Sequence, residues 1–202
     1  MALKTLPQAD ALIVPRRHRI TVSEFERMIA ANVWPEDERI ELIEGELIAM
    51  SPINAPHAAA LTALTEIFLQ PLQGRAVVWS QNPVRLDDDT RPQPDLALLR
   101  PPASRYRAQL PGPADVFLLI EISDTTLTYD RDRKLPLYAK AGIPETWLVD
   151  VNGEQVFAYR QPENGVYTQL TTYKRGAVIS PEAFPDVTVR VDDILGESDA
   201  AA

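Results

Sequence analysis

Cysteine is absent from this chain of 202 residues, and histidine occurs only twice, at His18 and His57. The lack of cysteine excludes disulfides, thiolate metal ligands and a cysteine nucleophile, and it suits a reducing compartment. Two histidines are too few for a histidine-rich zinc site. No apolar run is long enough to cross a membrane, and the apolar stretch 11–14 is too short for a signal peptide. We therefore expect a cytoplasmic protein without a membrane segment.

The chain also has fewer basic than acidic residues, and its formal net charge is −9. A protein that coats nucleic acid needs local positive charge to bind the phosphates, so this balance argues against non-specific coating. It does not exclude an enzyme whose carboxylates bind cations at a small site, with arginine and lysine side chains nearby.

The pattern along the chain predicts a single α/β domain. Residues 1–18 are interpreted as an N-terminal arm, 19–195 as the domain and 196–202 as a flexible tail, with no internal repeat or interdomain linker. A capping box at Thr21–Glu24 begins a first helix. Further helices are predicted at 57–72 and at about 130–141. Strands are predicted as a hairpin of 39–43 and 46–50 around Glu44-Gly45, then at 76–86, 95–99 and 115–123, as a second hairpin of 146–150 and 155–159, and at 166–173.

Glu121 is the most informative residue, because it follows the apolar run Val116–Ile120. Such a run is typical of a strand covered on both faces. The period of two places Glu121 on one face with Phe117 and Leu119. A buried carboxylate costs on the order of several kcal/mol unless it is paired or binds a metal. Glu121 is therefore a candidate metal ligand; the alternative is a strand-end residue that reaches solvent.

Asp95 is the second candidate, since Pro94-Asp95 opens the apolar strand 96–99. An isolated aspartate at the start of a strand is more commonly solvated. The combination with a second apolar strand that ends in Glu121 favours a shared site.

Lys134 is the third candidate. At helical spacing it shares a face with Leu137, Tyr138 and Ala141, so its ammonium needs a carboxylate partner. The alternative is an ion pair with Asp130 in which the ammonium reaches solvent. The following Pro136 is compatible with a helix only if the helix begins late, near position 132.

These three side chains suit one chemistry. Two carboxylates on neighbouring strands, Asp95 and Glu121, hold a hard divalent cation such as Mg²⁺, for which Mn²⁺ can substitute. The cation polarises a phosphate oxygen and lowers the pKa of a bound water, and Lys134 orients that water or offsets developing negative charge.

Short motifs follow one another from residue 19 to residue 195 in an order that resembles the Uma2 family of restriction endonuclease-like proteins, which is similar to the PD-(D/E)XK nucleases. Each motif by itself is common in proteins, but the occurrence of all of them in this order is more specific for the family. The motifs are Glu41-Leu-Ile-Glu-Gly-Glu46, Ser51-Pro52, His57, Pro94-Asp95, Glu121-Ile-Ser123, Asp130-Arg-Asp-Arg-Lys134, Tyr138-Ala-Lys-Ala-Gly142 and Trp147-Leu-Val-Asp150.

The resemblance implies a mixed β-sheet flanked by helices, a restriction-endonuclease-like core, with Mg²⁺ at one strand edge and DNA as the substrate. It would make Asp95 the motif aspartate and Glu121 the motif acid. The sequence departs from the superfamily at Ser123, where the motif lysine should stand. Family members replace that lysine with one from the following helix, and Lys134 matches this replacement.

Three further residues are supporting candidates. Glu46 would be an additional acid near the metal; the alternative is a solvated hairpin residue. His57 lies at a helix start on one stripe with Leu61 and Leu64, which equally suits a packed or capping histidine. Asp130 would hold the lysine of the next helical turn in place, or it is an ordinary acid at a helix start.

The loop 100–114 offers candidates for contact with DNA: Arg100, Arg105, Tyr106 and Arg107. Their guanidinium groups would form a phosphate-facing wall and the tyrosine ring would stack on a base. The alternative is a solvated loop whose arginines balance local acids.

The sequence is also compatible with two functions other than a DNA endonuclease. A catalytically silent binding or accessory module would keep the fold without the activity, as the missing motif lysine suggests. The same metal site would also suit another phosphate ester, since a fold does not determine a substrate. Cleavage of both DNA strands would usually need two active sites and hence a homodimer, for which the sequence gives no direct signal.

Overall fold

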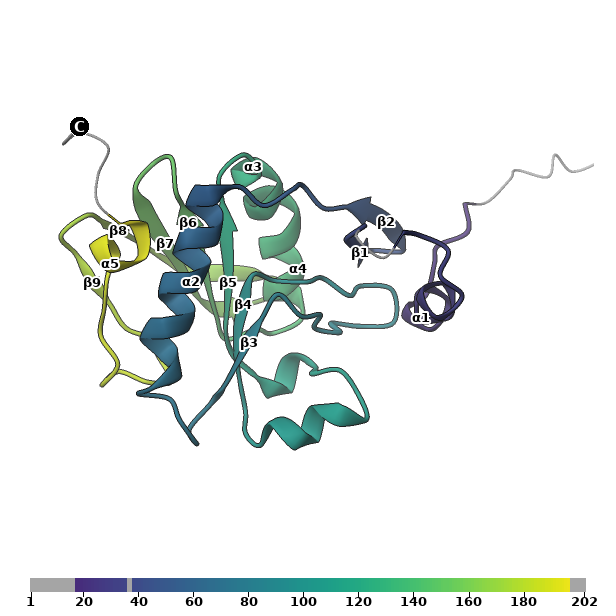
Figure 1. The fold of residues 1–202 in the computed structure, drawn as a ribbon, viewed down its shortest axis with the longest axis horizontal. Coiled ribbons are helices and arrows are strands. Elements are labelled where there is room, and N and C mark those ends of the chain that lie inside the picture. Colours follow the sequence, from purple (N-terminus) through teal and green to yellow (C-terminus); the bar gives the residue numbers. More distant parts are fainter. Residues whose placement is uncertain (1–16, 36–37, 197–202) are drawn as a thin grey trace, which may run out of the picture.

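The computed structural model describes residues 17–35 and 38–196, so most of the expected arm and tail lie outside the described residues. A mixed six-stranded sheet forms its centre, in the order β3-β4-β5-β6-β7-β8, with β5 and β6 parallel and the other neighbours antiparallel (Figure 1). The strands are β3 (Val77–Ser80), β4 (Leu96–Leu99), β5 (Val116–Ser123), β6 (Glu145–Asp150), β7 (Gln155–Glu163) and β8 (Val166–Lys174).

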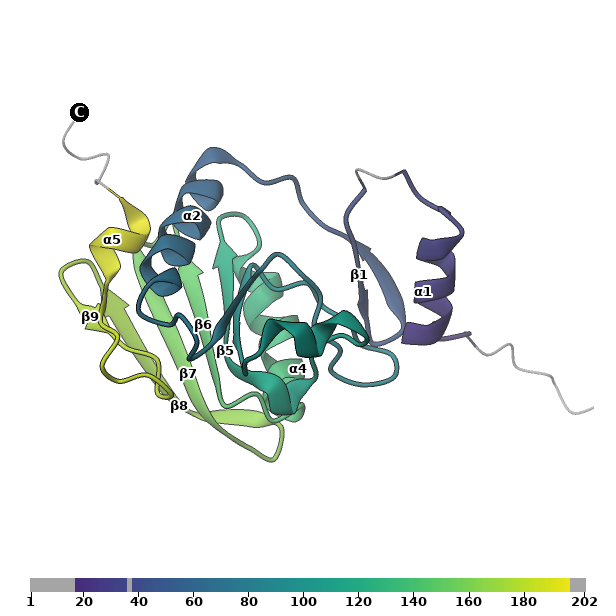
Figure 2. The same cartoon turned by 60° about the horizontal axis from the view of Figure 1, so that its bottom comes forward.

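Helices cover both faces of this sheet, so the α/β class and the mixed sheet flanked by helices are confirmed. One face packs on α2 (Ala55–Leu69) and α5 (Val191–Leu195), and the other on α4 (Leu135–Lys140) (Figure 2). The short α3 (Leu127–Tyr129) leads into α4, and β9 (Val178–Ile179) pairs with β10 (Val189–Arg190). Within the described residues, no helix has both the length and the apolar character that crossing a membrane requires.

The alternation along β5 separates the two cores. Leu118, Ile120 and Ile122 point to the α2 side, whereas Leu119 packs on the α4 side. Glu121 therefore shares a face with Leu119, as expected. Phe117 does not, because the pairing of β4 with β5 is irregular at this point and an extra residue turns its ring to the α2 side.

The first hairpin forms a separate two-stranded sheet of β1 (Ile40–Ile43) and β2 (Glu46–Ala49) beside the larger one. Helix α1 (Val22–Ala30) packs on it through Val22 and Phe25 against Leu42, and the predicted capping box of Thr21 and Glu24 is present. The hairpin matters for function because its inner face lies over the carboxyl end of β5.

Two strand predictions differ from the structure in length. The strand predicted at 76–86 ends at Ser80, because Gln81 adopts a left-handed conformation with φ 48° and turns the chain out of the ladder. The second hairpin is longer than expected, since β7 extends to Glu163 and pairs with β8 along most of its length. β8 is an edge strand of the sheet.

Two glycines allow a test of how tightly the hairpin turn is packed. Gly45 and Gly74 both have positive φ, +76° and +75°. A Cβ on Gly45 would lie 2.6 Å from Cβ of Arg19, whereas nothing lies within 4 Å of a Cβ on Gly74. We expect Gly74→Ala to lower the free energy of unfolding by about 1 kcal/mol from the left-handed conformation alone. Gly45→Ala should lose a further ~1–3 kcal/mol from the clash. Urea unfolding measures both, and equal losses would contradict the packing of this turn.

Candidate functional site

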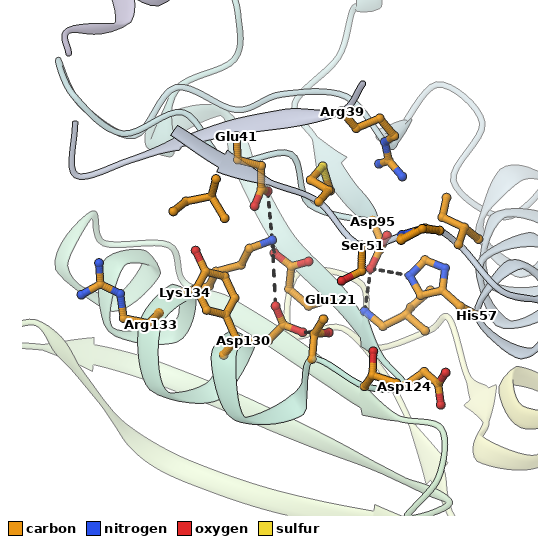
Figure 3. A pocket seen from close by; sticks show the side chains of 18 of the residues that line it. Arg39, Glu41, Ser51, His57, Asp95, Glu121, Asp124, Asp130, Arg133 and Lys134 are labelled. Atoms are coloured by element: carbon orange, nitrogen blue, oxygen red, sulfur yellow. Dashed lines mark hydrogen bonds and ion pairs between the residues drawn. The ribbon is translucent and has the colours of Figure 1, made fainter. Parts of the chain in front are cut away.

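A cavity of about 660 Å³ lies where the hairpin, the start of α2, the start of β4, the end of β5 and the α3–α4 segment meet (Figure 3). Its wall contains the predicted residues Asp95, Glu121 and Lys134, together with His57 and Asp130. The structure thus brings together five of the six residues predicted to act or assist at the site.

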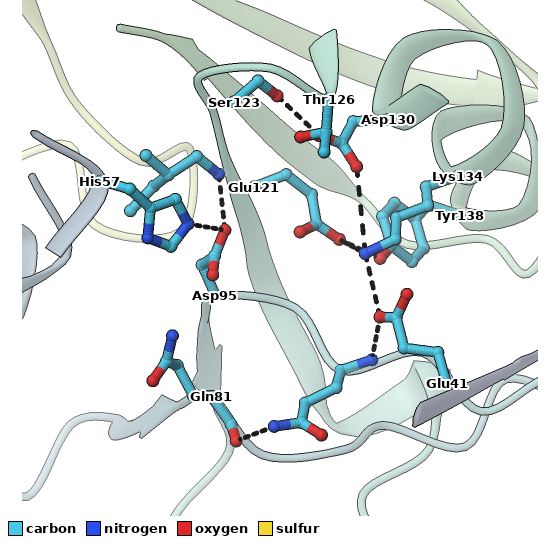
Figure 4. Close-up of polar contacts among 12 residues, drawn as sticks. Glu41, His57, Gln81, Asp95, Glu121, Ser123, Thr126, Asp130, Lys134 and Tyr138 are labelled. Atoms are coloured by element: carbon cyan, nitrogen blue, oxygen red, sulfur yellow. Dashed lines mark hydrogen bonds and ion pairs between the residues drawn. The ribbon is translucent and has the colours of Figure 1, made fainter. Parts of the chain in front are cut away.

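Asp95 and Glu121 meet because β4 and β5 run antiparallel. The start of β4 lies beside the carboxyl half of β5, with Leu96 paired to Ile120. One oxygen of Asp95, Oδ2, accepts the backbone N–H of Ile122 at 2.8 Å and lies 3.0 Å from Nε2 of His57 (Figure 4). Asp95 is therefore held in one orientation from two sides.

Glu121 is almost completely buried on the α4 side of the sheet. Its Oε1 accepts hydrogen bonds from the Tyr138 hydroxyl and from Nζ of Lys134 at 3.3 Å (Figure 4). Burial raises the pKa of the Glu121 carboxyl well above its usual value; the ammonium of Lys134 opposes this rise, and the neighbouring acids add to it.

Lys134 extends into the middle of the acids. Its Nζ lies 2.9 Å from Oε1 of Glu41, 3.3 Å from Oε1 of Glu121 and 4.0 Å from Oδ1 of Asp130. Burial alone would lower the pKa of this ammonium, but the three carboxylates outweigh that effect and raise the pKa. Lys134 is thus a buried cation. The expected carboxylate partner is present, and the prediction that the ammonium points towards Glu121 is confirmed; among the described contacts it pairs with Glu41 and Asp130 rather than with Asp95.

The backbone of residues 130–134 explains how Lys134 reaches this position. Asp130–Lys134 forms a π-helical turn between α3 and α4, in which the N–H of Leu135 bonds to the carbonyl of Asp130. The α-helix α4 begins at Leu135, so Pro136 lies in its first turn and the late start expected from this proline is confirmed, although α3 and the π-helical turn precede it. Proline lacks an N–H and crowds the carbonyl four residues before it, and we attribute the wider turn to this misfit.

Asp130 anchors this turn to the end of β5. Its Oδ2 accepts the hydroxyls of Ser123 at 2.7 Å and Thr126 at 2.6 Å. Ser123, at the position where the resemblance to the superfamily would place the motif lysine, therefore supports the acid that lies next to Lys134.

Glu41 is the site residue that sequence reasoning missed. Besides Lys134, its Oε1 accepts the backbone N–H of Gln93 at 2.6 Å, and the side chain is buried. Glu46, the supporting acid predicted from the sequence, is instead exposed and lines a neighbouring hollow of about 540 Å³. Both glutamates lie on the same face of the hairpin, but Glu46 lies nearer the turn. Glu41 stands between apolar neighbours in its strand, and that was the available signal.

The loop 100–114 does not contribute to the cavity. Tyr106 is buried, donates its hydroxyl to the carbonyl of Arg100 at 2.6 Å and packs on Trp79, so its ring is not available to stack on a base. Arg105 pairs with Asp115 at 3.0 Å, and the Arg100 guanidinium covers the ring of Phe117. The expected phosphate-facing wall is therefore not part of the cavity; these residues follow the end of β4 that is remote from Asp95.

Asp95 and Glu121 are the two carboxylates that could hold a divalent cation, and such an ion would keep part of its water shell. Within the described ranges, no three histidine or acidic side chains converge to hold a metal ion by themselves. The second oxygens, Oδ1 of Asp95 and Oε2 of Glu121, accept no hydrogen bond from the described residues, whereas the first oxygens do. Mg²⁺ is commonly bound by one or two carboxylates, with water and substrate phosphate as its other ligands. The donor set suits this ion better than zinc.

The comparisons with known proteins agree with this geometry. The sequence model of the Uma2 family, described as "Putative restriction endonuclease", matches residues 22–192. A crystal structure of "a putative nuclease belonging to DUF820" from Anabaena variabilis ATCC 29413 superposes with a TM-score of 0.68, at 19% identity, over 87% of this chain and 97% of its own. At that identity the likeness shows the fold alone, and no curated protein matches the chain. Both descriptions name a nuclease, and the chain belongs to the Uma2 family.

Proposed function

We propose that this protein is a Mg²⁺-dependent endonuclease that hydrolyses phosphodiester bonds of DNA at the cavity of Asp95, Glu121 and Lys134. The observation that carries the proposal is the 3.3 Å contact between Nζ of Lys134 and Oε1 of Glu121. It supplies a cation beside the carboxylate pair although Ser123 occupies the position of the superfamily lysine. Family membership supports a nuclease, and the site chemistry supports the metal.

The charges of the cavity support a bound cation. Six carboxylates line it against three permanent cations; the acids are Glu41, Asp95, Glu121, Asp124, Asp130 and Asp132, and the bases are Arg39, Arg133 and Lys134. A phosphate group would be repelled by this excess of negative charge. Divalent cations at the acids would reverse the local balance, because a bound metal is the largest charge in such a site.

The residues of the chain would share the work as follows. Asp95 and Glu121 would hold the ion through their second oxygens, and the hydrogen bonds to their first oxygens fix the orientation of each carboxylate. When bound, Mg²⁺ supplies Lewis-acid polarisation of the phosphate and a water of lowered pKa. Lys134, held by Glu41 and Asp130, would donate to the attacking water and offset the negative charge of the transition state.

The silent binding module and the hydrolase of another phosphate ester are outcomes of the experiments below. One copy of the site suffices to nick one strand. Cleavage of both strands by this protein would require two copies and hence a homodimer.

The first test concerns the metal. Asp95→Asn and Glu121→Gln each keep the size and shape of the side chain but remove a negatively charged ligand. Each should weaken Mn²⁺ binding by about tenfold or more, since removing even a residue that supports a metal ligand typically lowers metal affinity by about that factor. Isothermal titration measures this affinity. Asp150→Asn is a matched control, because this buried acid accepts from Gly153 and Gln155 and does not line the cavity. Parent-like affinity in both site variants would refute the ligand assignment.

The second test concerns Lys134. Lys134→Met keeps the apolar stem and removes the charge, so Mg²⁺-dependent nicking of supercoiled plasmid should fall roughly a hundredfold or more. Mn²⁺ affinity should be largely kept, since the lysine is not a ligand. Lys140→Met is the matched control, because Lys140 is exposed on the same helical segment and its loss should change nothing.

The outcomes of this experiment separate the three functions. If Lys134→Met nicks as fast as the parent, Lys134 is a packing residue and the mechanism is wrong. If the parent binds Mn²⁺ but does not nick DNA, the silent module or another phosphate ester replaces the proposal, and bis(p-nitrophenyl) phosphate distinguishes the two. Circular dichroism and the unfolding midpoint show whether each variant keeps the fold.

A further inference from the structure

Unpartnered polar atoms concentrate in the wall of the cavity. Among the described residues, six buried side-chain nitrogen or oxygen atoms have no hydrogen-bond partner in the protein. Three of them belong to residues that line the cavity: Nη2 of Arg39, the hydroxyl of Tyr129 and Nδ1 of His57. Buried polar groups without partners are rare in folded proteins, and each needs an explanation. A ligand that fills the cavity would supply one.

Arg39 reaches the cavity from the hairpin. It precedes β1, its carbonyl accepts the N–H of Met50, and the period of two places its side chain on the same face as Glu41. Figure 3 shows its guanidinium turned toward the cavity. Whereas Glu41 pairs with Lys134, Arg39 forms no ion pair with a carboxylate in the described part of the chain. Arg133, also in the wall, differs because it pairs with Glu44 at 3.2 Å.

A guanidinium in this setting is suited to an anionic oxygen. A buried donor that lacks a partner loses its hydrogen bonds to water without compensation, so an incoming acceptor restores them. The planar guanidinium offers parallel N–H groups that match the two free oxygens of a phosphate. Carboxylates of the protein surround the cavity, yet none of those described is close enough to Arg39 to pair with it. The group therefore remains available to a phosphate ligand.

Tyr129 lies between the main cavity and the second hollow, into which such a ligand would extend. It lines both the main cavity and the hollow of about 540 Å³, as do Ile48 and Arg133, so the two spaces are neighbours on either side of these residues. Arg19 also lines the second hollow. The Tyr129 hydroxyl is thus a neutral donor at the junction of the two spaces, beside two arginines.

We infer that Arg39 and Tyr129 bind non-bridging phosphate oxygens of one nucleic-acid strand, which runs from the His57 end of the main cavity into the second hollow. The inference takes the class of substrate from the proposed function and adds the path of the strand and the two groups that hold it. Arg39 then forms a charged contact near Asp95, and Tyr129 forms a neutral contact beyond the carboxylate pair.

The test measures binding without cleavage. A short fluorescein-labelled duplex is titrated with each protein in Ca²⁺, which replaces Mg²⁺, and the dissociation constant is followed as salt rises. Arg39→Met should bind roughly ten- to a hundredfold more weakly, as expected for a lost charged hydrogen bond. The slope of log Kd against log salt should fall by about one, because one phosphate contact is lost. Tyr129→Phe should weaken binding by about two- to tenfold with an unchanged slope, because a hydroxyl releases no counterion.

Two further variants control for charge and for folding. Arg39→Lys keeps the charge but loses the planar pair of donors, so it should keep the salt slope and bind with intermediate affinity. Arg75→Met removes an arginine that follows the far end of α2 and pairs with Asp186, and it should bind as the parent does. If Arg39→Met does not fold, as unfolding in urea would show, Arg39→Lys and Tyr129→Phe still decide the matter.

The outcomes distinguish this inference from the proposed function. Arg39→Met and Tyr129→Phe that bind with the parent's affinity and slope would overturn the inference even if the parent nicks plasmid. A parent that binds no duplex would overturn it as well. A parent whose binding depends on Arg39, but which does not nick DNA with Mg²⁺, would leave the inference standing and refute hydrolysis.

Discussion

The buried ammonium of Lys134 is the interaction on which the site depends. Removing an ammonium from water costs on the order of several kcal/mol, so it is buried only where carboxylates compensate. Here the carboxylates of Glu41, Glu121 and Asp130 do so, and they come from the hairpin, from the central strand β5 and from the π-helical turn. One cation therefore ties the hairpin, which is distant in sequence, to the neighbouring segments β5 and the π-helical turn. The hairpin is attached to the larger sheet at the place where a substrate would bind.

The same cluster accounts for a contrast in this protein between its overall charge and the function proposed for it. A chain with a net charge of −9 is a poor general binder of phosphate. The cavity, however, carries an excess of acids that Lys134 balances only in part. The pKa of Glu121 is raised there by burial first and by the neighbouring acids in addition. A divalent cation would relieve this excess and at the same time create a site for a phosphate, with the guanidinium of Arg39, which forms no ion pair with the described carboxylates, at its edge. Excess acid at the site and affinity for a polyanion are thus compatible once a metal is bound.

Much of the fold and the centre of the site could be predicted from the sequence because they depend on local periodicity. The apolar run that ends in Glu121 predicted a central strand, and the helical spacing of Lys134 with Tyr138 predicted that both face the sheet. Glu41 could not be chosen over Glu46 in this way. Both lie on one face of the same hairpin, and only the packing of the hairpin against a helix that begins more than eighty residues later decides which of them meets the lysine.

The sequence by itself determined the family, the alternation that places Glu121 beside Leu119, and the helical face of Lys134, because each follows from residues a few positions apart or from an ordered set of motifs. Tertiary structure alone decided the rest. The π-helical turn ahead of Pro136, the rotation of Phe117 to the opposite face and the burial of Tyr106 each depend on backbone register or on side chains from other elements. Periodicity states which side of an element is apolar, but it does not state which remote element covers that side. Only the packed structure places the carboxylate of Glu41 against Lys134 and, among the described residues, gives Arg39 no carboxylate partner.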